Sequence, residues 1–180
     1  MIDELLKILD ERIERKLARM NTAALGVVTQ VDLQKFRCNV KLKNKVHGKE
    51  VELFEVPIAV QKFGSGSVIV APSEGDVVVI IFSKHELEEQ LKNNEIVQVN
   101  EILRFGINNA IVIAGIHTLV DPIPQINQDE ILIQHKSGNY IKFQQDGRVV
   151  IKGDVYIDGD LDFKTIRGTN ADDGTWHNPP

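Results

Sequence analysis

The chain has 180 residues, of which 42% are hydrophobic and 26% are charged, and its net charge is −5. This composition is typical of a globular protein with one medium domain or a small domain with appendages. It excludes an internal disulfide framework, because Cys38 is the only cysteine. The acidic balance also argues against a surface built to neutralise phosphates, and no apolar run approaches the roughly 20 residues of a membrane-spanning helix.

The first segment, 1–22, predicts an amphipathic helix over residues 2–20. Its apolar residues recur at spacings of three and four, with acids and bases between them. Two interpretations stay open: the helix packs on its own domain, or it forms a coiled coil or docks onto a partner. The candidate docking residues are Ile2, Leu6, Leu9, Ile13 and Leu17. The segment lacks a basic stretch followed by an apolar run, so we expect synthesis in the cytoplasm without a secretory signal peptide.

Residues 23–120 predict a compact domain of short strands. The expected strands are 25–32, 36–43, 51–60, 67–71, 76–83 and 110–116, separated by turns rich in glycine, proline and polar residues. Five or six strands in this length favour a small closed barrel of the OB type. The continuous apolar run Val77–Phe82 predicts a strand covered on both faces. Residues 85–91 predict a short helix of the kind that plugs such a barrel.

A Pro-rich linker at 121–130 separates this domain from an unusual repeat in 131–166. From Ile141 to Phe163, odd positions are almost all apolar or glycine, and even positions are almost all polar, with a turn at Asp146-Gly147. The hexads VVIKGD at 149–154 and VYIDGD at 155–160 repeat within it, and their glycines permit bends. The alternation exceeds the length of an ordinary strand of ~3–10 residues, and no downstream segment could cover its apolar face.

We therefore expect other copies of the chain to cover this face, which favours an intertwined β-helical fibre over an enzyme core. The candidate core residues between copies are Ile141, Phe143, Val149, Ile151, Val155, Ile157, Leu161 and Phe163. Acidic residues and lysine on the even positions would keep the outer surface hydrated. The last segment, 167–180, loses all periodicity and is expected to be a tip or tail.

The order of these segments resembles the central spikes of contractile phage tails and phage-tail-like bacteriocins, of the baseplate assembly protein V type. The likeness lies in GVVTQVDLQKFRCNVKL at 26–42, VPIAV at 56–60, GSGSVIVAPSEGDVVVIIFSKHELEEQL at 64–91 and SGNYIKFQQDGRVVIKGD at 137–154. It implies a mainly β fold with an N-terminal helix, an OB-fold barrel and a short, intertwined trimeric β-helix. It also implies a homotrimer on the tail axis, bound to the baseplate hub below the tail tube, that pierces the target cell envelope.

The resemblance raises the question of a metal ion at the tip. Many spikes of this family hold iron at the apex with a His-x-His pair from each chain, whereas this tail has a single histidine, His177. Three copies of His177 on a threefold axis could bind one metal ion, since imidazole is a good ligand. The sequence alone favours a surface or disordered histidine, and a tip capped by another protein is a third alternative.

The usual catalytic motifs are missing from the sequence, so we expect no enzymatic activity. It contains no phosphate-binding loop, nucleophile elbow, paired-histidine zinc motif or C-x-x-C. One rival interpretation is a tail adaptor or receptor-binding fibre protein that recognises a surface polymer. Another is an OB-type nucleic-acid-binding module, against which the acidic balance and the 6% aromatic content both count.

Overall fold

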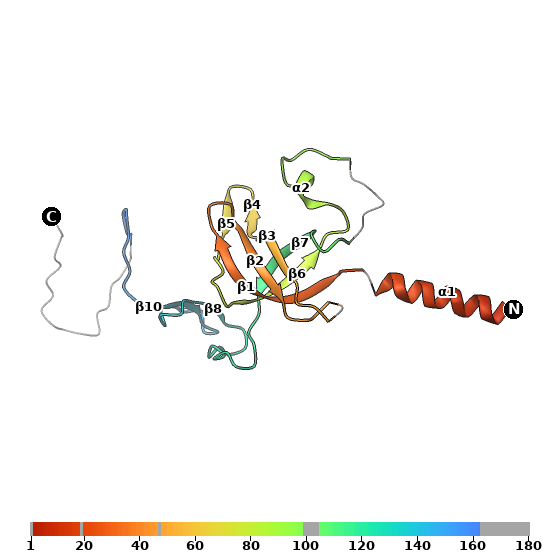
Figure 1. Cartoon of the computed structure of the whole chain (residues 1–180). Helices are drawn as coiled ribbons and strands as arrows, with labels where there is room; N and C mark the ends of the chain where they lie inside the picture. The colour runs from red at the N-terminus through yellow and green to blue at the C-terminus, as the bar shows by residue number, and fades with distance from the viewer. Residues whose placement is uncertain (1, 19, 47, 99–104, 163–180) are drawn as a thin grey trace, which may run out of the picture. The chain divides into compact units, whose positions relative to one another are not determined.

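The computed structural model describes residues 2–18, 20–46, 48–98 and 105–162 (Figure 1). The protein is mainly β, with an N-terminal helix and antiparallel sheets, as the sequence predicted. It divides into two compact units, Met1–Ile123 (unit 1) and Pro124–Pro180 (unit 2). The boundary between them falls within the Pro-rich stretch predicted as a linker.

The N-terminal helix, α1, spans Ile2–Leu17. Acids in its first turn and bases in its last turn complement the helix dipole. The predicted helix extended to Met20, but the α-helix ends three residues earlier. There the amide of Met20 donates to the carbonyl of Leu17 at 3.0 Å, which is the tighter bonding common at helix ends.

Unit 1 contains a five-stranded antiparallel sheet in the order β3-β2-β1-β6-β7 (Figure 1). The strands are β1 Ala23–Asp32, β2 Arg37–Leu42, β3 Glu52–Pro57, β6 Val77–Phe82 and β7 Ala110–Gly115. The two edges of the sheet meet just after β3, where Ile58 forms a parallel bridge with Val112. The amide of Ala59 also donates to the carbonyl of Val112 at 2.8 Å. The sheet therefore curves so that the chain after one edge strand, β3, is joined to the other edge strand, β7.

The core of unit 1 lies inside this curved sheet. Its most deeply buried side chains are those of Val28, Val40, Val78 and Ile80, one or two from each of three neighbouring strands. The prediction that Val77–Phe82 is covered on both faces is wrong for the single chain. Burial alternates along β6, and Ile81 on the outer face is 37% exposed. The reason is that a sheet closed around one core has no second layer on its outside.

Three shorter elements of unit 1 differ from the sequence prediction. The expected strand 67–71 is shortened to β5 Gly66–Val68, which forms a small hairpin with β4 Gln61–Phe63. The expected strand 51–60 is shortened to β3 Glu52–Pro57, and its pairing with β2 shifts register beside Glu55, whose φ is +54°. The expected barrel plug is a single turn, α2 Leu87–Gln90, and none of its residues is buried.

The amide and carbonyl of Glu55 are bound by side chains of β2, which explains how a non-glycine residue adopts this conformation. The Asn39 side chain accepts from the Glu55 amide at 3.0 Å, and the Arg37 guanidinium donates to the Glu55 carbonyl at 2.7 Å. These bonds offset the cost of the left-handed backbone.

Unit 2 contains a three-stranded antiparallel sheet in the order β10-β9-β8 (Figure 1). Its strands are β8 Ile131–Gln134, β9 Tyr140–Phe143 and β10 Val149–Lys152. The turn predicted at Asp146-Gly147 is confirmed as the connection from β9 to β10. The second hexad forms no strand in the single chain, so the expected continuation of the β system over 155–162 is wrong at this level. In the described part of the chain, no strand lies beyond β10 to pair with it.

Candidate functional site

The main candidate site is an open apolar face on the sheet of unit 2. The strand register aligns six large side chains in two rows that run across the three strands. The rows are Ile131–Phe143–Val149 and Ile133–Ile141–Ile151, which we call the apolar face. These side chains are 39% to 62% exposed, so no part of the described chain covers them fully. Such a contiguous apolar patch on a small protein marks an interaction surface.

The structure brings four of the eight predicted core residues together on this face, namely those from Ile141 to Ile151. Three others, Val155, Ile157 and Leu161, follow β10 and are also exposed. Phe163 lies outside the described residues. Sequence reasoning missed Ile131 and Ile133, although the short alternation ILIQ carries the same period-two signal.

Two turns built in the same way fix the register of the apolar face. In the first, the amides of His135 and Gly138 donate to the carbonyls of Asn139 and His135, both at 2.9 Å. In the second, the amide of Gln144 donates to the carbonyl of Arg148 at 2.8 Å, and the amide of Gly147 donates to the carbonyl of Gln144 at 3.0 Å. Each turn has a glycine with positive φ at its fourth position, +88° and +83°. This is a compact hairpin loop closed by a left-handed residue.

The second turn is further stabilised by an ion pair. The Arg148 guanidinium lies 2.6 Å from the Asp146 carboxylate, and this hydrogen bond lowers the pKa of Asp146. The pair is exposed, so its contribution to stability is small.

The opposite face of the sheet carries an ion pair that is shielded from solvent. The Nζ of Lys142 lies 2.7 Å from the Oε2 of Glu130, and the two side chains are 16% and 5% exposed. The Glu130 carboxylate also accepts from the amide of Asn127 at 2.8 Å. The hydrogen bond from Lys142 is the main cause that lowers the pKa of Glu130.

The hexad glycines occupy equivalent backbone conformations. Gly153 has φ +131° and Gly159 has φ +139°, values that side-chain-bearing residues rarely adopt. Both lie at bends in the chain, as the sequence predicted. Because the bends recur after six residues, each hexad changes direction in the same way.

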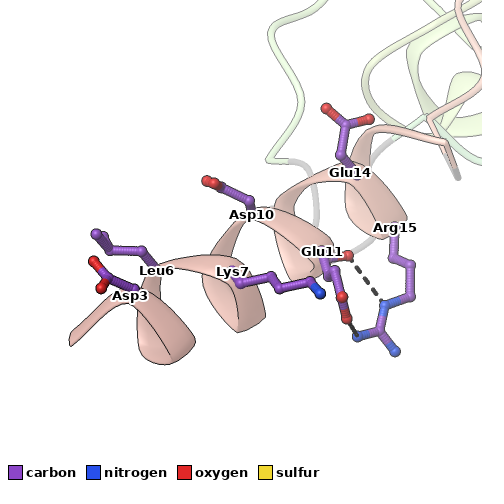
Figure 2. A pocket seen from close by; sticks show the side chains of 7 residues that line it. All are labelled: Asp3, Leu6, Lys7, Asp10, Glu11, Glu14 and Arg15. Atoms are coloured by element: carbon purple, nitrogen blue, oxygen red, sulfur yellow. Dashed lines mark hydrogen bonds and ion pairs between the residues drawn. The ribbon is translucent and has the colours of Figure 1, made fainter. Parts of the chain in front are cut away.

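The second candidate surface is α1. Its five predicted docking residues are 44% to 76% exposed, and α1 packs against no other helix or strand in the described part of the chain. The structure thus disagrees with the interpretation that this helix packs on its own domain. Figure 2 shows a shallow groove along α1, where Arg15 pairs with Glu11 at 3.8 Å and also donates to its carbonyl at 3.1 Å.

Unit 1 has an apolar cavity of about 380 Å³ between the Ile58–Gln61 segment, the Val68–Pro72 segment and β7. Its one acidic residue, Asp76, accepts a hydrogen bond from the amide of Ser73 at 2.7 Å, so the carboxylate holds a turn. Asp121, which follows β7, holds a turn in the same way. Its carboxylate accepts from the amide of Thr118 at 2.6 Å, and this bond lowers its pKa.

The described residues contain no group of three His, Cys, Asp or Glu side chains that could hold a metal ion. The predicted tip ligand, His177, lies outside them. Within the same ranges, no helix has the length and apolar character needed to span a bilayer. Comparison of the sequence with protein-family models and with curated proteins gave no match.

Proposed function

We propose that this protein is a homotrimeric, non-enzymatic spike at the tip of a contractile tail or related injection apparatus. In this proposal unit 1 attaches to the baseplate hub, and unit 2 projects forward to pierce the target cell envelope. The observation that carries it is the open apolar face of unit 2, together with the exposed apolar residues of the hexads that follow.

Burial of this face between copies supplies the driving force for assembly. Nine exposed side chains of Val, Leu, Ile or Phe lie between Ile131 and Leu161 in each copy. Burying one Val, Leu, Ile or Phe is worth roughly 1.5–3 kcal/mol relative to exposure. Three copies that turn these residues toward a common axis therefore form a dry core without a globular domain behind it.

The hexads require such an assembly to become strands. Residues 154–162 pair with no strand among the described residues of one copy, whereas neighbouring copies can pair with them and hide the strand edges. Exposed aspartates at 154, 158, 160 and 162 stay on the outer surface and keep it hydrated. A narrow, interlocked fibre of this kind suits the transmission of force along its axis.

Unit 1 fits the hub-attachment part of the proposal as a barrel of the OB type. This assignment is supported by five antiparallel strands in the order β3-β2-β1-β6-β7 and by the parallel bridge that joins the two edges. The resemblance of residues 26–42 and 64–91 to tail spikes gives the same assignment.

Analytical ultracentrifugation of the purified full chain tests the proposal. We expect a stable trimer at micromolar concentration, and a stable monomer would overturn the proposal. Labelled protein in assembled particles provides the second test. An axial position at the tail tip is expected of a spike, whereas a peripheral position would favour a receptor-binding fibre.

A further inference from the structure

We propose that α1 associates with α1 of other copies as a parallel helix bundle, in which the acidic flank of each helix contacts the basic flank of the next. The occupant of the apolar stripe on α1 is thus a second copy of this chain. The inference rests on the homotrimer proposed above and extends it to the N-terminal end of the chain.

The stripe is continuous along the whole helix. At 100° per residue, Ile2, Leu5, Leu6, Leu9, Ile13 and Leu17 fall within about one third of the helix circumference. All six are exposed, and no other element of the described chain covers them. An exposed apolar stripe of this length is typical of a helix that packs against another helix.

The charges beside the stripe are separated by sign. Asp3, Asp10 and Glu14 lie along one edge, which we call the acidic flank. On the other side, Arg12 lies just outside the stripe and Lys16 lies just inside its edge, between Leu5 and Leu9. We call these two residues the basic flank. Figure 2 shows Asp10 and Glu14 on one side of the ribbon, with Arg15 on the opposite side.

The helix dipole does not account for this separation. It favours acids in the first turn and bases in the last, which explains Asp3 and Lys16. Asp10 and Arg12, however, lie in the middle of α1, where the effect of the dipole has decayed. Their placement on opposite edges of the stripe therefore needs another reason.

The two flanks select the orientation of the partner helix. In a parallel bundle with rotational symmetry, one edge of each helix faces the opposite edge of its neighbour, so the acidic flank meets the basic flank. In an antiparallel pair, each edge faces its own equivalent, so acids meet acids and bases meet bases. Charge complementarity thus favours parallel copies, the arrangement that a threefold axis imposes.

The length of α1 explains why this bundle depends on the trimer. Sixteen residues make a helix of about 24 Å, which is short for an independent coiled coil. Assembly through unit 2 holds three copies of α1 in one particle and raises their effective concentration, commonly to the millimolar range. Weak apolar contacts between the stripes and attraction between the flanks are then sufficient to hold the helix bundle together.

A cysteine placed in the stripe of the full-length protein tests orientation and partner together. In a parallel bundle, Leu6→Cys lies opposite itself and forms a disulfide between copies under mild oxidation. In an antiparallel pair, position 6 of one copy lies opposite Ile13 of the other. The two cysteines at position 6 are then about 10 Å apart along the axis, which is beyond disulfide reach. The native Cys38 does not interfere, because it is 2% exposed and burial raises its pKa.

The matched control is Lys7→Cys, which places the thiol on the polar side of α1, away from the stripe. We expect disulfide-linked dimers in the trimer fraction to be about tenfold more abundant for Leu6→Cys than for Lys7→Cys. Asp10→Lys in the Leu6→Cys background should reduce this yield, and adding Arg12→Glu should restore it. Glu11→Lys makes the same charge change away from both flanks and should leave the yield unchanged.

The outcomes separate this inference from the proposed function. The inference alone is overturned if the Leu6→Cys protein is a trimer but yields no more disulfide-linked dimer than the Lys7→Cys protein. That result is expected if the stripe instead binds a hub protein. A monomer overturns the inference and the spike proposal together. A trimer linked selectively through position 6 supports the inference.

Discussion

Lys142 donates to Glu130 across a distance of 2.7 Å, on the face of the unit 2 sheet opposite the apolar face. The pair links β9 to the residue that precedes β8. Because both side chains are largely shielded from water, neither charge is fully hydrated if its partner is removed. This contact therefore helps to hold a sheet that has little core of its own.

The pair predicts an acid-sensitive unit 2. The pKa of Glu130 is lower in the folded protein than its ordinary value of 4.5, so its contribution to stability is full above that value. The contribution is lost as the pH falls through 4.5 toward the folded pKa. We expect Glu130→Gln to lower the thermal midpoint at pH 7 and to lessen its fall between pH 5 and 3, as measured by circular dichroism. Equal pH dependence in both proteins would contradict this role.

Val155→Asp is predicted to prevent trimer formation. Val155 is exposed in the single chain, so the substitution leaves the fold of one copy intact. In the trimer it would place three carboxylates in a shared apolar core, at several kcal/mol for each buried charge. Size-exclusion chromatography with light scattering should give a monomer. Tyr156→Asp, a neighbouring substitution at an exposed position of opposite parity, is the control and should remain trimeric.

Gly26→Ala is predicted to destabilise unit 1 through overpacking. An added Cβ would overlap the Cγ1 of Val40 and lie 2.8 Å from the Cδ1 of Ile80, two side chains in the centre of the core. Overpacking of this kind costs about 1–3 kcal/mol in the free energy of unfolding. Gly66→Ala is the control, because its Cβ would meet only the carbonyl of Phe63 at 3.8 Å. Urea denaturation of both variants, followed by far-UV circular dichroism, measures the difference.

Gly153→Ala is predicted to strain the bend after the first hexad. The backbone there has φ +131°, and an added Cβ would lie 3.0 Å from the Cγ of Asn139. A left-handed conformation costs an alanine about 1–2 kcal/mol relative to glycine. Denaturant titration of the trimer should show a lower midpoint for this variant. Asp154→Ala, at the next and exposed position, should leave the midpoint nearly unchanged.

Local patterns in the sequence predicted the elements better than they predicted the contacts between them. The turn at Asp146-Gly147 and the bends at Gly153 and Gly159 follow from residue type alone, so they agree with the structure. The parallel bridge between Ile58 and Val112 depends on two segments far apart in the chain, and no short-range pattern signals it.

The errors have physical causes of the same kind. The outer face of β6 is as apolar as its inner face, so the sequence of β6 does not reveal that only one face is buried in the single chain. The apolar face of unit 2 was only partly predicted, because the register that aligns Ile131 and Ile133 with β9 is set by the turn at 135–139.

The bridge between Ile58 and Val112 also has a consequence for folding. Each of the three strands described in unit 2 pairs with its neighbour in sequence, so that sheet can form as soon as its two turns do. Unit 1 can close only after β7 has been synthesised, and until then β3 and β6 each expose an unpaired edge. A nascent chain that stalls before residue 110 would therefore expose two unpaired strand edges and an incompletely buried hydrophobic core. We expect truncation before β7 to yield aggregates rather than a smaller folded barrel.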